Sequence, residues 1–486
     1  MRVLHYGAGD EALGEWLRDQ VPELEVDTQP NGAAYDAVVV YDLLEREATP
    51  ERLLEGAEAR VRPGGRVYVS TPNGAFADGN NPEHLRTYRA HDLADLLRRR
   101  GRLEDMRVGG DGVTAASYVP GKRRGDVAIY CGPGWEQWSP HDIERKGLGG
   151  SETAAIRLAQ HLSDLGYVVT VYGEVEQCAF RDVIFRHHSV FDPMERRQAV
   201  ICSRIPELAD RRINAASRML WLHDTDAGDR LTERRAEAFD HVLCLSRWHA
   251  THVRGLYPFA KEKVRRIRNG IELAYFEGKA PQRERRVLYT SSPDRGLDIL
   301  LELWPRIREQ APDAELAHCY SSVYDAVAKQ RPEVAAHHEL ITKLTRQDGV
   351  TALDSMPQPR LAELMRASLV WAHPSYNTPF NVPFHETSCI GAMEAQAAGC
   401  LVVASSWGAL PETVRVGRLV DSEPLSDRWR DAFVEHIVEG LTDCSVQRWA
   451  SERGPEEAKA FAWDGVARQV AGLVEGESFA FARTAS

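Results

Sequence analysis

Short apolar runs, separated by polar, glycine-containing loops and helix-forming segments, recur along the chain. Residues 126–131 form one such run; after it, residues 154–165 have the composition of a helix, and a further apolar run follows at 166–172. Residues 286–290 and the helical segment 297–310 repeat the arrangement. Apolar runs of strand length that alternate with helices are typical of α/β proteins with parallel sheets. The pattern therefore predicts an α/β fold built from several units.

The first 120 residues predict a small unit of this kind. A strand, a glycine-rich turn and a helix in this order are typical of the start of a nucleotide-binding α/β fold. The predicted elements are a strand at 2–6, the turn Gly7-Ala8-Gly9-Asp10, a helix at 12–20, a strand at 35–40 and, after the turn Arg62-Pro63-Gly64-Gly65, a strand ending at residue 70.

Polar linkers at 120–125 and 276–285 suggest domain boundaries. A chain of 486 residues is also too long for a single core. We expect four segments: a reduced α/β domain at 1–120, a second at 121–278, a third at 279–460, and a C-terminal helix and tail at 461–486.

Two carboxylates flank the start of a predicted helix in the third segment. Glu386 precedes it and Glu394 lies inside it, and a helix over 391–398 would put Glu394 in its first turn. Gly399 ends the helix, and the apolar run 401–404 predicts a strand. Acidic side chains can accept hydrogen bonds from ligand hydroxyls, and free N–H groups at a helix N-terminus suit a phosphate. The arrangement fits a ligand with sugar hydroxyls and a diphosphate.

Further candidate side chains follow predicted strands, where open α/β sheets bind their ligands. The pair Gly149-Gly150 precedes a helix, so that backbone can approach an anion closely. His223 follows a buried strand, and Arg295 lies in a loop suited to a diphosphate. The plainer interpretations are a structural histidine and a solvated loop charge.

Composition narrows the classes of function. The formal net charge of -12 disfavours broad binding to nucleic acid or to anionic membranes, although a local basic groove stays open. The eight cysteines lack metal-ligand spacing and several lie in apolar runs, which fits buried thiols in a reducing compartment. Neither a signal peptide nor an apolar run of membrane-spanning length is present. We expect a cytoplasmic protein without stable membrane insertion.

Residues 126 to about 480 resemble family-4-type glycosyltransferases with the GT-B fold. The resemblance rests on pieces in the family's order: Gly149-Gly150 before a helix, Ser246-Arg247, Asn269-Gly270-Ile271, Arg295-Gly296, Glu386-x7-Glu394 followed by Ala-x-Ala-Ala-Gly, and Phe461-Ala462-Trp463-Asp464. The family commonly has an arginine and a lysine after the first strand of its C-terminal domain. Here Ser291 or Ser292 replaces the first and Arg295 stands at the second. The loop 376–385 is longer and more aromatic than usual and is expected to shape the sugar pocket.

The resemblance implies two Rossmann-like domains that face a cleft, and transfer of a sugar from a nucleotide-diphosphate sugar with retention of anomeric configuration. It assigns sugar hydroxyls to Glu386, ribose hydroxyls to Glu394 and positioning to His223. Arg295, Ser292 and helix N-termini would stabilise the departing diphosphate, so no metal or other cofactor is required. The catalytic candidates are Glu386, His223 and Arg295, and the donor-binding candidates are Gly149, Gly150, Ser246, Asn269, Ser292, Arg295, Thr387, Ser388, Cys389, Ile390 and Glu394.

Residues 1–120 resemble a class I S-adenosylmethionine-dependent methyltransferase, but depart from it where chemistry would need it. The positions of the usual acid and of the third glycine hold His5 and Glu11. Asp27 could be the ribose-binding acid, yet too few residues separate it from the strand at 35–40 for the family's intervening helix and strand. A degenerate domain for docking, acceptor binding or homo-oligomer formation is therefore the favoured interpretation, and S-adenosylmethionine is not expected as a cofactor.

Three functions follow as hypotheses. The first is a retaining glycosyltransferase whose acceptor is a glycan, a lipid-linked sugar, a protein, a small molecule or modified DNA. The second is a bifunctional methyltransferase and glycosyltransferase. The third is an inactive scaffold that binds sugar nucleotides. The sequence identifies neither the sugar nor the acceptor.

Overall fold

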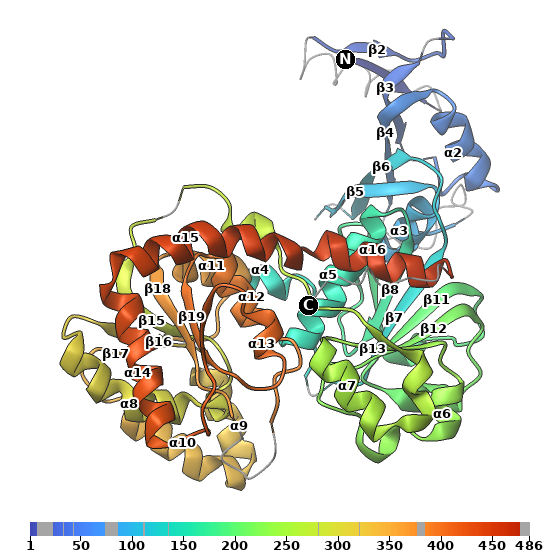
Figure 1. Cartoon of the computed structure of the whole chain (residues 1–486). Helices are drawn as coiled ribbons and strands as arrows, with labels where there is room; N and C mark the ends of the chain where they lie inside the picture. The colour runs from blue at the N-terminus through green and yellow to red at the C-terminus, as the bar shows by residue number, and fades with distance from the viewer. Residues whose placement is uncertain are drawn as a thin grey trace. The chain divides into compact units, whose positions relative to one another are not determined.

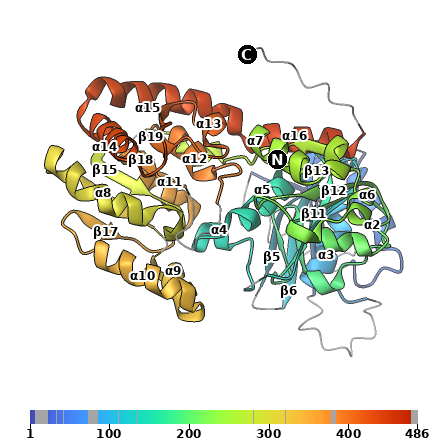
Figure 2. The same ribbon diagram turned by 60° about the horizontal axis from the view of Figure 1, so that its bottom comes forward.

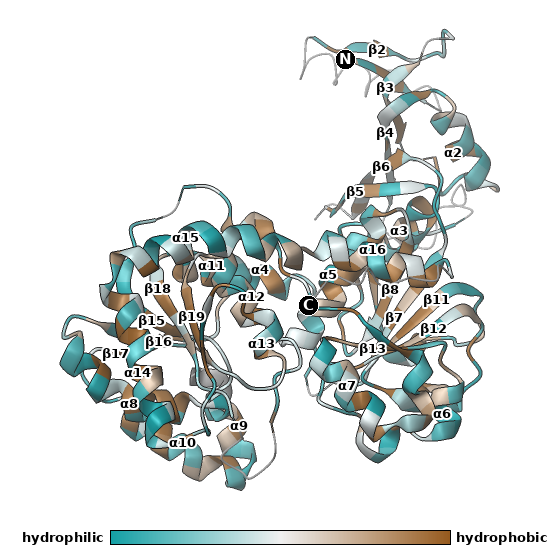
Figure 3. Cartoon of the chain, viewed as in Figure 1, coloured by the Kyte–Doolittle hydropathy of each residue, from teal (hydrophilic) through white to brown (hydrophobic). Residues whose placement is uncertain are grey.

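The computed structural model describes residues 1–6, 23–32, 34–41, 43–72, 86–109, 112–134, 136–279, 281–319, 321–376 and 384–476. The chain divides into two compact units, one made of residues 1–139, 159–200 and 214–216, and the other of residues 140–158, 201–213 and 217–486. Strands of the described residues form three sheets (Figure 1). Figure 3 shows apolar residues concentrated in the strands and on the helix faces that pack against them. The predicted α/β fold is confirmed.

The first sheet has the strand order β2-β1-β3-β4-β6-β5. Strands β1 to β4 pair in parallel, and β6 runs antiparallel to both β4 and β5. Apolar residues of this sheet form one core with helices α2 (Pro50–Glu58) and α3 (Ala90–Arg98). The strands are β1 (Arg2–His5), β2 (Glu25–Asp27), β3 (Tyr35–Tyr41), β4 (Val61–Pro72), β5 (Gly101–Val108) and β6 (Val113–Pro120).

Strand β2 of this sheet was not predicted from the sequence, and one predicted turn differs in the structure. Asp27 ends β2, a strand of three residues that is too short to show a hydrophobic period. The predicted turn at 62–65 lies within β4: Val61 pairs with Tyr35 and Arg66 with Ala37, so residues 62–65 bulge out of the ladder. Gly64 has a φ of 79° there, which a glycine adopts without strain. The predicted turn 7–10, Glu11 and the helix 12–20 lie outside the described residues.

The second sheet has the order β14-β13-β12-β11-β7-β8-β10-β9. Pairs β7/β8, β8/β10, β12/β13 and β13/β14 are parallel, and β9 is antiparallel to β10. Helix α5 (Gly150–Asp164) starts four residues before the predicted start. The strands are β7 (Asp126–Gly132), β8 (Val168–Gly173), β9 (Cys178–Phe180), β10 (Val183–His187), β11 (Arg197–Ser203), β12 (Ala215–Trp221), β13 (His241–Cys244) and β14 (Val264–Arg266).

The third sheet has the order β17-β16-β15-β18-β19-β20, and all its pairs are parallel. One face packs against α8 (Leu297–Gln310) and α14 (Asp427–Thr442), and the other against α11 (Gln358–Arg366) and α12 (Ile390–Ala397). Helices α9 (Ser321–Gln330) and α10 (Pro332–Leu344) lie side by side (Figure 2). The strands are β15 (Glu284–Tyr289), β16 (Glu315–His318), β17 (Val350–Ala352), β18 (Ser368–His373), β19 (Leu401–Ser405) and β20 (Gly417–Val420).

The last two helices of the described residues are α15 (Cys444–Ala458) and α16 (Trp463–Val474). Helix α16 is buried along one side, and Ala462 before it forms a bridge with Ile271. The Ser217 hydroxyl also donates to the carbonyl of Leu473, at 3.3 Å. None of the helices in the described residues combines the length and apolar character that a membrane crossing requires. The described residues include all eight cysteines, and no disulfide joins any of them.

Candidate active site

The N-termini of α5 and α12 meet in the second compact unit. A Cβ built on Gly150, the first residue of α5, would lie 3.8 Å from Cδ1 of Ile390, the first residue of α12. Gly149 and Gly150 are exposed, and the carbonyl of Gly149 accepts from the N–H of Thr153 at 3.0 Å. Two helix ends with free N–H groups therefore face one region, a favourable arrangement for an anion.

Glu386 lies just before α12 and is ionised. It is 6% exposed, and its Oε1 atom is 3.0 Å from Nε2 of His373 and 3.8 Å from Nη1 of Arg295. Burial alone would raise the pKa of the Glu386 carboxyl, but the hydrogen bond to His373 and the charge of Arg295 hold it below its usual value. The structure therefore brings the candidate acid Glu386 and the candidate cation Arg295 together, and His373 joins them.

Arg295 and Ser292 belong to the loop after β15. Arg295 ends the short 3-10 helix η6 (Pro293–Arg295), and its guanidinium lies 4.4 Å from the centre of the Phe384 ring. Two fifths of the Arg295 side chain is exposed, so a ligand can reach it. The Ser292 hydroxyl donates to Asp294, and its carbonyl accepts from Tyr289 Oη at 2.8 Å. The Ser292 hydroxyl therefore stabilises this loop through its hydrogen bond to Asp294.

Gly296 gives this loop its shape. Its φ is 103°, and a Cβ there would lie 2.7 Å from the carbonyl oxygen of Pro374, in the loop after β18. Only glycine combines that backbone conformation with so close an approach. The loops after β15 and β18 therefore press together, which explains why Arg295 and Glu386 meet.

Glu394 is the fifth residue of α12 and not a residue of its first turn, as the sequence had predicted. Cys389, with a φ of 58°, is the N-cap, so the helix begins at Ile390, one residue earlier than expected. Burial raises the pKa of Glu394 to about 7, against a lowering effect of Arg157. Glu394 thus exchanges a proton near neutral pH, whereas Glu386 stays charged.

Arg157 reaches this region from α5. It is 2% exposed, its Nη2 lies 2.5 Å from Tyr275 Oη, and its Nη1 lies 3.6 Å from Glu272 Oε2. Its position inside a helix carries no motif, so sequence reasoning missed it. His373 also escaped notice, although it ends an apolar strand and the rule that selected His223 would have found it.

His223 follows β12, as predicted, and is tied to the segment that carries Glu386. The Thr387 hydroxyl donates to its carbonyl at 3.0 Å, and its ring lies 4.3 Å from the ring of Trp221. Burial, with smaller effects of Arg204 and His249, lowers the pKa of His223 to about 3. The imidazole is therefore neutral at pH 7 and suited to positioning by hydrogen bonds.

Ser246 caps helix α7 (Arg247–Leu256), because its Oγ accepts from the N–H of His249 at 3.0 Å. The other free N–H groups of this helix end are taken up by Glu412 of α13 (Leu410–Thr413), which accepts from Arg247 at 3.0 Å and from Trp248 at 2.8 Å. The proposed donor role of Ser246 stays a prediction, and its hydroxyl has a structural role here.

Three further donor-binding candidates, Ser388, Cys389 and Asn269, are buried. Ser388 is 3% exposed, and its carbonyl accepts from Thr413 Oγ1 at 2.8 Å. Burial raises the pKa of the Cys389 thiol well above its usual value, so it is a poor nucleophile. Asn269 is 4% exposed and precedes the bridge between Ile271 and Ala462. Atoms of His373, Glu386 and Cys389 lie within 4.8 Å of one another, which is a spacing that a metal ion could use.

Three aromatic rings lie beside Glu386. The His385 ring stacks on Trp407 at 4.8 Å and on Trp248 at 4.9 Å between ring centres. Trp248 belongs to α7, while His385 and Phe384 end the predicted aromatic loop, whose residues 377–383 lie outside the described part of the chain. Flat apolar faces next to a carboxylate suit the binding of a sugar ring.

Known proteins similar to this chain include glycosyltransferases. Residues 276–439 match the family model described as glycosyl transferases group 1. The chain is similar to a D-inositol 3-phosphate glycosyltransferase of Kribbella flavida (25% identical, over 48% of this chain and 55% of the relative) and to one of Corynebacterium aurimucosum (31%, over 36% and 39%). An O-antigen chain mannosyltransferase B of Escherichia coli is 30% identical over 27% and 31%. The chain spans about half, or less, of the length of these curated relatives.

Solved structures show the same fold. Sucrose-phosphate synthase from Thermosynechococcus elongatus matches with a TM-score of 0.55 at 19% identity, over 73% of this chain and 99% of that one. WaaG, a glycosyltransferase involved in lipopolysaccharide biosynthesis, matches with a TM-score of 0.51 at 16% identity, over 72% and 100%. The chain therefore has the predicted GT-B fold.

Proposed function

We propose that this chain is a retaining glycosyltransferase, which moves a sugar from a nucleotide-diphosphate sugar to an acceptor hydroxyl. The observation that carries the proposal is the buried, ionised Glu386, bonded to His373 and close to Arg295 at the N-terminus of α12. A charged carboxylate beside a cation and a helix end offers acceptors for hydroxyls and donors for phosphate in one place.

The two acids bind different parts of the donor. Glu386 accepts hydrogen bonds from the sugar hydroxyls, with His373 holding its carboxylate in place. Glu394, with a pKa of about 7, binds the ribose diol. Arg295 and the N–H groups at the starts of α5 and α12 bind the diphosphate.

In the reaction the bond between the anomeric carbon and the diphosphate oxygen breaks, and the acceptor oxygen attacks from the same face. The acceptor proton passes to the departing diphosphate, so atoms and charge balance without a protein base. Negative charge grows on the leaving group, and Arg295 with the helix ends stabilises it. In this mechanism they take the part for which a metal is otherwise used, and the neutral His223 only positions the substrates.

The acceptor is the open part of this proposal. Because two of the matched relatives are named D-inositol 3-phosphate glycosyltransferases, this phosphorylated polyol is the first acceptor to test. Glycans, lipid-linked sugars, proteins, small molecules and modified DNA follow. No observation favours S-adenosylmethionine-dependent methylation, since Asp27 accepts hydrogen bonds from Arg2 and Asn31, both at 3.0 Å.

The test combines binding with turnover. A panel of nucleotide sugars is screened for thermal stabilisation of the full chain, because a bound donor raises the melting temperature by mass action. With the donor so found, hydrolysis and transfer are measured in the parent and in Glu386→Gln, which we expect to lower kcat by about 100-fold or more. NMR of the product gives its anomeric configuration.

Glu439→Gln is the matched control. Glu439 pairs with Arg418 at 2.8 Å on α14, and its loss should leave kcat within about twofold. Equal turnover in the parent and in Glu386→Gln would contradict the proposed site, and inversion of configuration would contradict the proposed mechanism. Donor binding without any turnover would instead support the inactive scaffold.

A further inference from the structure

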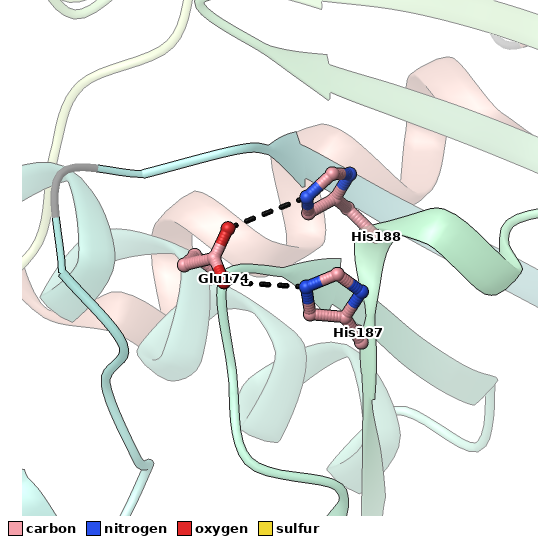
Figure 4. Close-up of side chains that lie close together, drawn as sticks. All are labelled: Glu174, His187 and His188. Atoms are coloured by element: carbon pink, nitrogen blue, oxygen red, sulfur yellow. Dashed lines mark hydrogen bonds and ion pairs between the residues drawn. The ribbon is translucent and has the colours of Figure 1, made fainter.

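Two histidines and a carboxylate converge in the first compact unit, among residues that no part of the sugar-transfer proposal uses. Glu174 follows β8, His187 ends β10, and His188 opens the short 3-10 helix η1 (His188–Val190). Figure 4 shows both imidazoles pointing toward the same carboxylate. The Nε2 atom of His187 is 3.2 Å from Oε1 of Glu174, and that of His188 is 3.3 Å from Oε2.

The backbone explains why neighbouring residues point the same way. Successive side chains of a strand alternate between faces, so His187 and His188 would diverge if β10 continued. The chain instead leaves the strand at His187 and turns into η1, which brings the two ring centres to 4.3 Å. In the parallel pair β8/β10, Gly173 is the partner of His187, so Glu174 stands beside both rings.

We propose that Glu174, His187 and His188 bind a divalent transition-metal ion of the Zn²⁺ type. One ligand atom from each residue lies within 4.8 Å of the other two. Ligands about 2.1 Å from a tetrahedral centre are about 3.4 Å apart, close to the two distances found here. Two imidazoles and one carboxylate form a ligand set that Zn²⁺, Co²⁺ and Ni²⁺ accept, whereas Mg²⁺ and Ca²⁺ prefer oxygen.

The surroundings support ligation through Nε2. The Nδ1 atom of His187 is 2.7 Å from the Ser189 hydroxyl and 3.3 Å from the Ser189 backbone nitrogen, so it donates to the hydroxyl in one tautomer and accepts from the N–H in the other. In the tautomer that donates to the Ser189 hydroxyl, the lone pair of Nε2 faces Glu174 and is available to a metal ion, which is how ligating histidines are usually oriented. The three side chains are between 22% and 39% exposed, so an ion can enter and a water molecule can complete its coordination.

The site would link the carboxyl ends of two adjacent strands. Phe191, directly after η1, packs on Tyr130 of β7 and Tyr172 of β8, at 4.9 and 5.0 Å between ring centres. A metal ion bound at His188 would therefore hold η1 on this edge of the sheet. Metal binding should be saturable, and it should raise the melting temperature of the chain.

The experiment uses the untagged full chain, stripped with a chelator and titrated with Zn²⁺ by calorimetry and with Co²⁺ by visible absorption. We expect one equivalent to bind at pH 7.5, with d–d bands for Co²⁺. His188→Ala and Glu174→Gln should each weaken Zn²⁺ binding by about 100-fold or more, beyond the loss typical of an outer partner. Zn²⁺ should raise the melting temperature of the parent but not of these variants.

His436→Ala is the matched control, because His436 faces a single carboxylate, Glu439, at 3.6 Å, and it should bind as the parent does. Cys389→Ala tests the buried cluster of the sugar-transfer site. No saturable binding in the parent would overturn the proposal. So would binding that survives His188→Ala and Glu174→Gln, or that is lost in Cys389→Ala instead.

Discussion

The two carboxylates around α12, Glu386 and Glu394, look alike in the sequence, but the structure shifts their pKa values in opposite directions. Burial raises the pKa of both, but Glu386 also has a hydrogen bond to His373 and the charge of Arg295, and its pKa falls. Glu394 has only the more modest effect of Arg157, and its pKa rises to about 7. Carboxyls pushed in opposite directions mark a functional site more strongly than either would alone.

Glu394→Gln should therefore stabilise the fold and weaken donor binding. Because the pKa of Glu394 is raised from 4.5 to about 7, folding favours its protonated form, and the chain loses stability as the pH rises through this window. The neutral amide removes that loss. We expect a gain of roughly 3 kcal/mol in the free energy of unfolding at pH 8 and little change at pH 4. Denaturant unfolding at both pH values measures it.

Donor affinity should fall about tenfold or more in Glu394→Gln, because the amide cannot replace a carboxylate that accepts from both hydroxyls of a ribose. Glu439→Gln again serves as the control. A variant that is no more stable at pH 8 would contradict the raised pKa of Glu394. A variant that is more stable but binds donor normally would contradict its ribose role.

At the residue scale, the sequence pointed to side chains that follow a strand or that precede a helix. His223 and Arg295 were selected by the first rule and Glu386 by the second, and the structure brings Glu386 to Arg295, and Thr387 to His223. Sequence reasoning had no means of finding Arg157, which points inward from the middle of a helix. The hydroxyls of Ser246 and Ser292 show the other limit, because local capping and loop contacts compete with ligand binding.

At the scale of elements, the start of α5 offers a test that separates binding from folding. A Cβ on Gly150 would meet only Ile390, at an ordinary contact distance of 3.8 Å, so Gly150→Ala fits the unliganded protein. The methyl group would nevertheless occupy space where backbone approaches the diphosphate. We expect an unchanged melting temperature and donor affinity about tenfold lower, measured by calorimetry with the donor found above.

Gly255→Ala is the control for this variant. Gly255 lies on the exposed side of α7, and a Cβ there would meet nothing within 4 Å. It should bind donor as the parent does and gain up to about 1 kcal/mol of helix stability. Unchanged donor affinity in Gly150→Ala would show that the ligand does not approach this end of α5.

Long apolar runs made the elements predictable, and short or interrupted ones did not. The buried run at β19 and the helix α8 lie where the sequence predicted them. Strands β2, β9 and β14 have three residues each, too few to show a period, and their pairing depends on partners distant in sequence. The turn at 62–65 was recognised from its glycines and proline, but the sequence could not show that β4 continues through it.

At the scale of the whole molecule, order along the chain predicted the fold better than any single motif. The GT-B fold was implied by a resemblance that rests on several short pieces in the family's order along two runs of strand, loop and helix, and solved structures agree. The boundaries of the two compact units do not coincide with these runs, since residues 140–158 belong to the same unit as residues 217–486. That grouping arises from tertiary contacts, which periodicity does not encode. The helix α16 is one source of them.

The packing of α16 depends on Gly270, nearly two hundred residues earlier. A Cβ on Gly270 would lie 2.6 Å from the indole of Trp463 and 2.9 Å from its Cα, so the helix backbone itself would have to move. Overpacking of this kind costs about 1–3 kcal/mol. We expect Gly270→Ala to lower the denaturant midpoint and to increase proteolysis near residue 463, whereas Gly255→Ala should do neither. A Gly270→Ala protein that unfolds like Gly255→Ala would show that the contact between Gly270 and Trp463 does not hold α16 in place.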